Sequence, residues 1–255
     1  MFSPQGPGLR ELAVQAMSST ERGYDLLAPK FDHTPFRTPD HVVAAVGEEL
    51  RPLGPFRAGL DVCCGTGAGT ALLARHCAER AVGVDFSAGM LAVARENFDR
   101  DGSASARGRG REETGTPVPR WVRADALALP FVGAFDLAVS FGAFGHFRPA
   151  ERPALFGGVY RSLRPGGLFA FPVPAPPSVG SAAYWTLCAF DGVMRLRNLL
   201  RRPEFVMYYR TFRLPEVIRD LERAGFRTEL APLTRLGTLP GGAPRARLVL
   251  ARRPS

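Results

Sequence analysis

The feature that most constrains the fold of this chain is a glycine-rich turn, Gly65-Thr66-Gly67-Ala68-Gly69. Directly before it lies a short apolar segment, 60–64, that is typical of a buried strand, and directly after it an apolar helix is expected from Thr70 to about Cys77. Glycines at such a junction let the backbone approach a ligand, and the start of a helix offers unpaired N–H groups. The sequence therefore predicts a ligand-binding strand–turn–helix unit of an α/β fold.

The spacing within this turn differs from the fingerprint of dinucleotide-binding domains. That fingerprint is G-x-G-x-x-G, whereas here the third glycine comes one residue early and Thr70 stands in its place. The strand before the turn also contains an acidic residue, Asp61. A buried carboxylate at this point suits a ligand with a positive group, such as an amine or a sulfonium.

Short apolar strands and amphipathic helices alternate through the rest of the chain. This alternation predicts a Rossmann-like, doubly wound sheet that is mostly parallel and covered by helices on both faces. Helices are expected at 87–97 and 215–224. With the strand before the glycine turn, seven strands are expected, the other six at 81–85, 121–123, 135–140, 168–173, 226–230 and 247–251, the last two as an adjacent pair.

Two further acidic residues follow neighbouring strands. Asp85 ends the second strand, where a carboxylate can accept hydrogen bonds from both hydroxyls of a ribose. Asp125 comes just after the third strand, where its side chain could accept from an adenine amino group. Each acid alone is equally well interpreted as a helix N-cap. Together with the glycine turn, however, three carboxylates at the carboxyl ends of adjacent strands indicate one ligand crevice.

On these residues, the chain resembles the class I S-adenosylmethionine-dependent methyltransferases of the small-molecule, UbiE-like group. The matching stretches follow the order of the family and cover roughly the middle half of the chain. They are LDVCCGTGAGT (60–70), VGVDFSAGML (82–91), VRADALALPF (122–131), FDLAVSFGAFGHF (135–147) and LRPGGLFAF (163–171). The first two stretches are the most specific, and the last is a supporting marker of the fold.

The resemblance implies S-adenosyl-L-methionine as cofactor, S-adenosyl-L-homocysteine as product, and no metal. It implies that Asp61 lies near the methionine amino group, Asp85 at the ribose and Asp125 at the adenine N6. The other cofactor-binding residues that it implies supply backbone contacts or packing. They are Tyr24, Phe31, Cys63, Gly65, Gly67, Phe86, Met90, Ala126, Ser140 and Phe141.

Three segments lie outside this pattern. The helical region 1–50 carries two aromatic–acidic pairs seven residues apart, and it is similar to the lid that closes over the cofactor in many family members. The insertion after the fifth strand, 174–213, has apolar residues at helical spacing, for which core packing and a lid over the substrate remain equally open. Residues 99–119, rich in Gly, Arg and Ser, are expected to form a surface loop.

The expected units are therefore an N-terminal helical lid (1–50), a cofactor-binding core (51–173), a lid insertion (174–213), and a last helix with the C-terminal strands (214–255).

Methyl transfer from a sulfonium is a direct displacement, so the protein has to align the reactants, exclude water and, where needed, remove a proton. His146 is the best general-base candidate by position, with a packing role as the open alternative, and His33 and His41 are weaker candidates. The expected acceptor is a small molecule, in particular the hydroxyl of an aromatic or polyketide-like compound, with N- and C-methylation left open. The residues expected to line its pocket are Trp185, Phe190, Tyr208 and Tyr209.

The net charge of +9 raises alternatives to this function. The arginines are scattered, apart from small clusters at 107–111 and 195–202, and this distribution argues against a nucleic-acid partner. An RNA-modifying methyltransferase and a non-catalytic module that only binds the cofactor nevertheless stay open. The second arginine cluster could also make a peripheral contact with an anionic membrane.

Composition sets the remaining bounds. A chain of 255 residues fits one α/β domain with a lid, as either a monomer or a homodimer. No apolar run reaches the ~20 residues of a membrane-spanning helix, and the first ten residues do not resemble a signal peptide. The four cysteines have neither disulfide-framework nor zinc-site spacing, so a reducing cytoplasm is the expected location.

Overall fold

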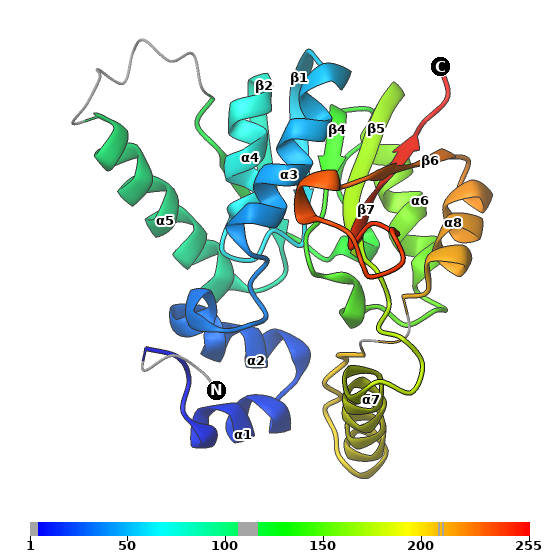
Figure 1. Ribbon diagram of the computed structural model, residues 1–255. Coiled ribbons are helices and arrows are strands. Elements are labelled where there is room, and N and C mark those ends of the chain that lie inside the picture. The colour runs from blue at the N-terminus through cyan, green and yellow to red at the C-terminus, as the bar shows by residue number, and fades with distance from the viewer. Residues whose placement is uncertain (1–4, 107–116, 209, 211) are drawn as a thin grey trace.

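A computed structural model of the chain describes residues 5–106, 117–208, 210 and 212–255 (Figure 1). Its centre is a seven-stranded sheet of order β3-β2-β1-β4-β5-β7-β6. The strands are β1 (Phe56–Val62), β2 (Cys77–Asp85), β3 (Arg120–Arg123), β4 (Phe135–Val139), β5 (Leu163–Pro174), β6 (Arg227–Pro232) and β7 (Ala246–Arg252). The predicted Rossmann-like, mostly parallel sheet of seven strands is thereby confirmed.

The pairing of the strands determines where a ligand can bind. Strands β1 to β5 pair in parallel, whereas β7 runs antiparallel to both of its neighbours, β5 and β6. Asp61 lies between Gly83 of β2 and Val139 of β4. The strand order reverses between β1 and β4, and in open α/β sheets ligands bind at such a switch point, outside the carboxyl ends of the strands.

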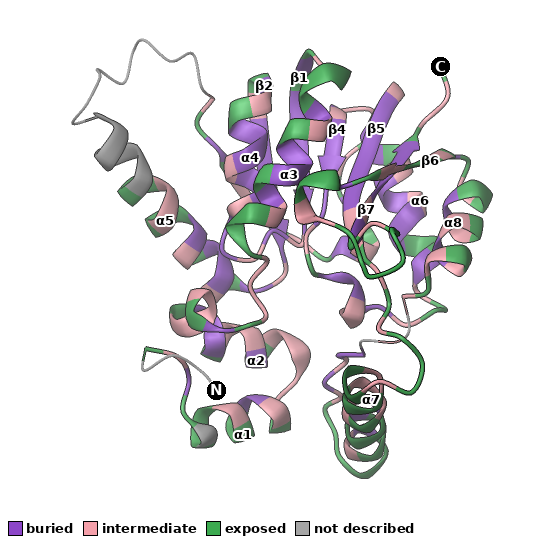
Figure 2. Ribbon diagram, in the orientation of Figure 1, coloured by how far each residue is buried: buried purple, intermediate pink, exposed green. Residues whose placement is uncertain are grey.

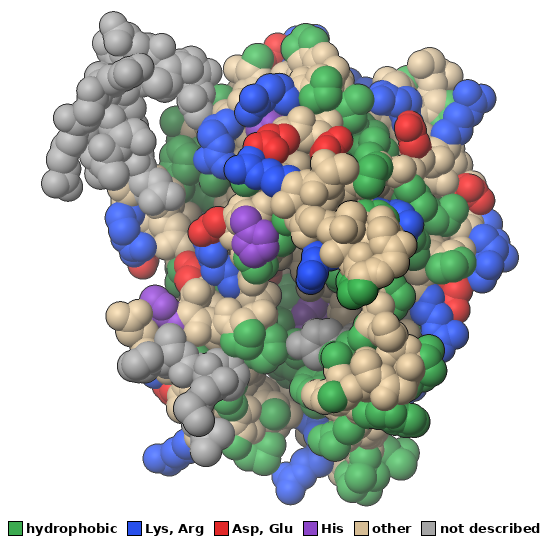
Figure 3. All heavy atoms as spheres, in the orientation of Figure 1, with side chains coloured by type: hydrophobic (Ala, Val, Ile, Leu, Met, Phe, Trp, Pro, Cys, Tyr) green, Lys and Arg blue, Asp and Glu red, His purple; other side chains and the backbone are tan. Residues whose placement is uncertain are grey.

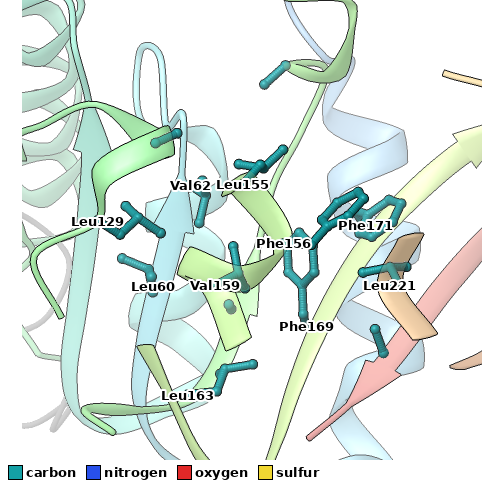
Figure 4. Packing of buried hydrophobic residues seen from close by; sticks show 14 of the residues in the cluster. Leu60, Val62, Leu129, Leu155, Phe156, Val159, Leu163, Phe169, Phe171 and Leu221 are labelled. Carbon is teal, nitrogen blue, oxygen red and sulfur yellow. The ribbon is translucent and has the colours of Figure 1, made fainter. Parts of the chain in front are cut away.

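Helices cover both faces of the sheet because side chains alternate between its two sides. On one face, α3 (Asp40–Leu50) and α4 (Ala68–His76) pack on Leu137 and Leu168. On the other face, α6 (Arg152–Ser162) and α8 (Leu214–Arg223) pack on Phe169 and Phe171 (Figure 4). Helix α5 (Ala88–Ala106) contacts β2 and β3.

Other helices lie beyond this core. The N-terminal elements α1 (Leu9–Met17), α2 (Thr20–Leu27) and the short 3-10 helix η1 (Ala28–His33) lead to α5, which α2 and η1 contact. Helix α7 (Ala182–Leu200) follows β5 and stands at the foot of the molecule in Figure 1, at the same end as α1. Within the described part of the chain, no helix combines the length and the apolar character needed to cross a bilayer. The remaining 3-10 helices are η2 (Arg51–Leu53), η3 (Ala126–Ala128), η4 (Phe144–His146) and η5 (Thr234–Leu236).

One prediction about the loops was wrong in part. The surface loop expected at 99–119 is helical over its first eight residues, 99–106, because α5 continues to Ala106. The low helix propensity of the Gly and Ser in that stretch is a weak signal that a continuing helix overrides. Residues 107–116, with the first arginine cluster, lie outside the described residues. Strand β5 also begins earlier than expected, at Leu163, which pairs with Phe135 of β4.

Candidate active site

A cavity of about 670 Å³ lies at the carboxyl ends of β1, β2 and β4. Its walls come from the glycine turn, from the loops after β2, β3 and β4, from the N-terminal elements, and from the segment after α7. The lining is mostly apolar, with a few carboxylates and one histidine. Such a size and lining are typical of small-molecule sites.

Asp61 presents an unusual carboxylate to this cavity. It is 1% exposed, and its Oδ2 accepts a hydrogen bond from the Thr70 hydroxyl at 2.8 Å. The other oxygen, Oδ1, is buried without a hydrogen-bond partner among the described residues. Burial raises the pKa of Asp61 to about 7, with a further contribution from the negative charge of Asp85, while the Thr70 hydrogen bond opposes the shift. A cationic group beside Oδ1 would supply the missing partner and stabilise the ionised form.

Glycine is present at each of three positions around Asp61 for a different structural reason. A Cβ on Gly69 would lie 2.7 Å from both Asp61 Oδ2 and the Phe141 ring, so only glycine leaves room at this part of the wall. Gly65 also lines the cavity, with a φ of 52°. Gly67 does not line it: this residue begins α4 with a φ of 93°, and a Cβ there would lie 2.9 Å from the Trp121 ring. Gly67 therefore has a packing and backbone role in this structure, and its predicted cofactor contact stays a prediction.

Cys63, just after β1, lines the cavity in a strained conformation. It has a φ of 59° and is, within the described part of the chain, the only non-glycine residue with a positive φ. Burial raises the pKa of its thiol, as do the neighbouring charges of Asp85, Asp61 and Asp125, so the sulfur stays protonated.

Asp85 connects the glycine turn to the start of α5. Its Oδ2 accepts a hydrogen bond from the Gly65 N–H and its Oδ1 one from the Ser87 N–H, each at 2.9 Å. Burial raises the pKa of this carboxyl too, and these backbone hydrogen bonds oppose the shift. Each oxygen retains acceptor capacity for a ligand in the cavity. Asp125 is both an N-cap, accepting from the Leu127 N–H at 2.9 Å, and a cavity residue, so the two interpretations of this acid coexist.

Most of the predicted cofactor residues meet in this one cavity. Ser140, like Gly67, is an exception: it is 1% exposed, and its hydroxyl donates to the Val62 carbonyl at 2.7 Å, which joins β4 to β1. The predicted residues that line the cavity are Tyr24, Phe31, Asp61, Cys63, Gly65, Asp85, Phe86, Met90, Asp125, Ala126 and Phe141.

His146 lies on the cavity wall in a defined protonation state. Its Nδ1 is 2.6 Å from the Val206 carbonyl oxygen, and its Nε2 is 2.7 Å from the Tyr24 hydroxyl. Because a carbonyl can only accept, Nδ1 carries the proton and Nε2 accepts from Tyr24. Burial lowers the pKa of His146, which keeps the ring neutral. Both ring nitrogens thus have protein partners, so a proton from the cavity could reach the neutral Nε2 only through the Tyr24 hydroxyl. His33 and His41 are exposed and do not line the cavity.

The N-terminal segment is anchored to the core by two acids whose aromatic neighbours line the cavity. Asp25 Oδ1 accepts from the Ser87 hydroxyl at 2.6 Å and from the Gly89 N–H at 2.9 Å, so it caps the start of α5. The neighbouring Tyr24 forms part of the cavity wall. This long-range capping has no local sequence signal.

Asp32 makes the second anchor. Its Oδ1 accepts from the Thr66 hydroxyl at 2.6 Å, and its Oδ2 accepts from the Asn97 side-chain amide at 2.9 Å. Thr66 belongs to the glycine turn, so the N-terminal segment is joined directly to the ligand-binding loop. The neighbouring Phe31 lines the cavity, as Tyr24 does.

Of the expected substrate-pocket residues, the three that the structure describes do not line the cavity. Trp185 is 62% exposed, and Phe190 packs against the buried cluster of Met194, Phe205, Met207 and Tyr208. Tyr208 donates its backbone N–H to the Gly145 carbonyl, but its side chain points to α7, where its hydroxyl accepts from the Asn198 amide at 2.9 Å. Tyr209 lies outside the described residues.

Other residues form the wall that sequence reasoning assigned to these aromatics. They come from the N-terminal elements, from the loop after β4 and from the segment after α7. Only their proximity to predicted helix starts and strand ends could have indicated them. They are Thr20, Glu21, Pro35, Phe36, Arg37, Thr38, Gly142, Ala143, Phe147, Glu151, Val206 and Met207.

Residues 60–167, which contain most of these walls, match the family model of the methyltransferase domain. This stretch is a class I S-adenosylmethionine-dependent methyltransferase domain. The cofactor of the methyltransferase domain is S-adenosylmethionine, and its product is S-adenosylhomocysteine. The described residues contain no group of three or more His, Cys, Asp or Glu side chains placed to hold a metal ion.

Curated methyltransferases are similar to part of this chain. A 2-phytyl-1,4-naphtoquinone methyltransferase of Thermosynechococcus vestitus is 30% identical over 156 residues, 59% of this chain and 62% of that protein. A demethylmenaquinone methyltransferase of Thermus thermophilus is 43% identical over 122 residues, 46% of this chain and 48% of that protein. The chain thus spans less than two thirds of the length of each relative.

A solved S-adenosylmethionine-dependent methyltransferase from Clostridium acetobutylicum covers more of the chain. It superimposes with a TM-score of 0.58 at 15% identity, over 86% of this chain and 93% of that one. At this level of identity, the similarity extends the shared fold beyond the methyltransferase domain and carries no information about the acceptor.

Proposed function

We propose that this protein transfers the methyl group of S-adenosylmethionine to the hydroxyl of a small aromatic or polyketide-like compound. The observation that carries the proposal is one apolar cavity whose wall holds both the unpartnered Asp61 oxygen and the neutral Nε2 of His146. The first suits the cationic cofactor, and the second suits an acceptor that loses a proton. The relatives named for methylating naphthoquinones and demethylmenaquinone support an aromatic acceptor.

The residues that line the cavity fit the cofactor. Asp61 Oδ1 would accept from the methionine amino group, Asp85 from the ribose hydroxyls, and Asp125 from the adenine amino group. Gly65 would give backbone access, while the side chains of Phe86 and Met90 would pack on the adenine. When bound, S-adenosylmethionine supplies an electrophilic methyl group on a positively charged sulfur.

The other residues of the wall would prepare the acceptor. The Tyr24 hydroxyl passes its proton to His146 Nε2 as it takes the proton of the acceptor hydroxyl, so the acceptor O–H bond breaks while its new O–C bond forms. The bound cofactor would supply the methyl group and keep the S–C electron pair as a neutral thioether. The His146 imidazolium would later release its proton to water. Phe31, Phe36 and Phe147 exclude water from the reacting atoms.

The two helical segments outside the core would have unequal roles. Residues 1–50 act as the lid, because their aromatics line the cavity and their acids hold them to the cofactor loops. The insertion 174–213 contributes its tail, Val206 and Met207, to the wall. We further propose a cytoplasmic protein, monomeric or homodimeric, that makes a peripheral contact with a membrane when its acceptor is lipophilic.

The test is a transfer assay with methyl-labelled S-adenosylmethionine and three kinds of acceptor: a dihydroxynaphthalene, an aliphatic carboxylic acid and transfer RNA. We expect label only on the dihydroxynaphthalene, and fragmentation in a mass spectrometer locates it on oxygen. Label on a ring carbon would replace O-methylation with C-methylation. Label on RNA alone would overturn the small-molecule acceptor, and cofactor binding without any transfer would leave a non-catalytic module.

A further inference from the structure

Helix α7 buries polar side chains and exposes apolar ones. Its buried residues are Asp191, Met194 and Asn198. Asn198 donates to the Phe205 carbonyl and accepts from the Phe205 N–H, both at 3.0 Å, and Asp191 accepts from the Arg210 N–H at 3.1 Å. The side of the helix that carries these two polar residues together with Met194 is thus held against the body of the protein. An amphipathic helix on a soluble core is expected to turn its large apolar side chains inward, whereas most of those of α7 point outward.

The outward side of α7 forms an apolar stripe, which we call the α7 patch. In Figure 2 most of this helix is coloured as exposed, and in Figure 3 hydrophobic side chains gather over it. The intervals of eight, three and four residues that connect Trp185, Val193, Leu196 and Leu200 place the members along one side of the helix. The members are Trp185 (62% exposed), Val193 (65%), Leu196 (57%), Leu199 (81%) and Leu200 (71%). A contiguous apolar surface of this kind marks an interaction site.

The charges beside the α7 patch have one sign. The exposed charged side chains between residues 182 and 203 are Arg195, Arg201 and Arg202, and the one acid in this range, Asp191, is buried. Arg202 also pairs with Glu204. A second copy of the chain would bring more arginines to this surface rather than counter-charges. An anionic lipid surface supplies both the apolar layer and the negative charge.

The α7 patch is connected to the wall of the cavity. Arg197 donates to the Ser18 carbonyl at 3.1 Å, and the Val206 N–H donates to the Thr20 hydroxyl at 3.0 Å, so the end of α7 is joined to the turn between α1 and α2. Next to this turn Met17 is 53% exposed, which extends the apolar surface. Thr20 and Val206 themselves line the cavity.

We propose that the α7 patch docks on an anionic lipid surface, with α7 lying parallel to the bilayer. A helix of 19 residues is about 28 Å long, which gives an interfacial contact of useful size. Docking would bring the cavity wall close to the lipid, so that a lipophilic acceptor could enter from the bilayer. The entry of an acceptor from the bilayer rests on the proposed function, whereas the docking itself does not.

The test is co-sedimentation of the full chain with phosphatidylcholine vesicles, with and without phosphatidylglycerol. We expect binding only to the anionic vesicles, weakened at high salt, with a blue shift of Trp185 fluorescence that is lost in Trp185→Phe. The double variant Leu199→Ser/Leu200→Ser should bind at least about tenfold more weakly, because the interfacial contact loses two apolar side chains. The matched control is Val132→Ser, which changes an 83% exposed residue before β4 and should bind unchanged.

A second pair of variants tests the charge. Arg201→Glu/Arg202→Glu should lose the preference for anionic vesicles, whereas Arg227→Glu on β6 should keep it. Calorimetric titration with S-adenosylmethionine should give unchanged affinities for all these variants, which shows that they are folded. The proposal is overturned by absence of binding at low salt, by equal loss in the control variants, or by patch variants that change only the oligomeric state. Transfer to a water-soluble acceptor without vesicles separates failure of docking from failure of the proposed function.

Discussion

The Tyr24 hydroxyl lies 2.7 Å from Nε2 of His146, although the two residues are 122 positions apart in the chain. Their rings meet edge to face with centroids 5.1 Å apart, and the Val206 carbonyl holds the opposite nitrogen of the imidazole. One residue belongs to the N-terminal helices and the other to the core. The contact of the N-terminal segment with the core is therefore also the contact that completes this hydrogen-bonded pair.

Replacing His146 tests its role in proton transfer. We expect His146→Ala to lower kcat by about a hundredfold, the lower end of what general-base catalysis contributes, while the affinity for S-adenosylmethionine changes little. Tyr24→Phe should lower kcat as well if the proton passes through the hydroxyl. The exposed His33→Ala is the matched control. An unchanged kcat in His146→Ala would mean that positioning alone suffices.

The affinity for S-adenosylmethionine should depend on pH through Asp61. The pKa of the free carboxyl is raised to about 7, and a bound ammonium group would lower it, so binding requires the ionised form. The affinity for S-adenosylmethionine is then highest above pH 7, where Asp61 is ionised. It falls as the pH decreases through this value, by at most about tenfold per pH unit. Calorimetric titrations between pH 5 and pH 8 measure this slope.

The control for this pH dependence is Asp61→Asn. It should bind the cofactor weakly and without the slope, because the titrating group is gone. A slope that persists in Asp61→Asn would assign the pH dependence to another residue.

Removing the Asp85 carboxylate should largely abolish cofactor binding. We expect Asp85→Ala to lower the affinity by about a hundredfold, since two hydrogen bonds to a charged group, each worth about 1.5 kcal/mol, are lost. Asp85→Asn preserves the shape of the side chain and should have a smaller effect. Calorimetry measures both, and an affinity equal to that of the unmodified protein would refute the ribose contact.

Breaking the second anchor should loosen the N-terminal segment. Asp32→Ala removes the acceptor of the Thr66 and Asn97 hydrogen bonds, so we expect faster proteolysis within residues 1–50 and a cofactor affinity lower by about tenfold. Asp40→Ala is the control, because Asp40 has an 80% exposed side chain paired with Arg37. Equal rates of proteolysis in the two variants would contradict the role of Asp32 as the second anchor.

Cys63→Gly should stabilise the protein. A non-glycine residue at a φ of 59° costs about 1 kcal/mol relative to glycine, and this exceeds the entropy that glycine adds to the unfolded chain. Thermal unfolding should therefore shift upward by a few degrees. Cys63→Ala removes the thiol but keeps the Cβ, and it should show no such gain.

The presence of three acids on the wall of the cavity was predictable from local patterns. Asp61 lies near the end of β1, Asp85 ends β2 and Asp125 follows β3, and parallel strands bring their carboxyl ends to one edge. Gly67 and Ser140 show the limit of this reasoning. Both lie in the right loops, but their contacts are with Trp121 and Val62, and one-dimensional spacing does not reveal these partners.

The acceptor side was not predictable for a different reason. An apolar stripe at helical spacing predicts an amphipathic helix, but it does not state which side meets the protein. In α7 the hydrogen bonds of Asp191 and Asn198 decide the orientation, and they turn Trp185 outward. The contributions of Val206 and Met207 follow from that orientation rather than from their own sequence context.

The adjacency of β1, β2 and β3 has a consequence for how ligands are distinguished. The three acids lie at the carboxyl ends of neighbouring strands, which are spaced about 4.8 Å apart, so they form a row along the edge of the sheet. Each acid would contact and recognise one part of an elongated ligand. Free methionine and free adenosine should therefore bind at opposite ends of this row without competing with each other. A cofactor analogue that is altered at one end should lose only the contact with the acid at that end.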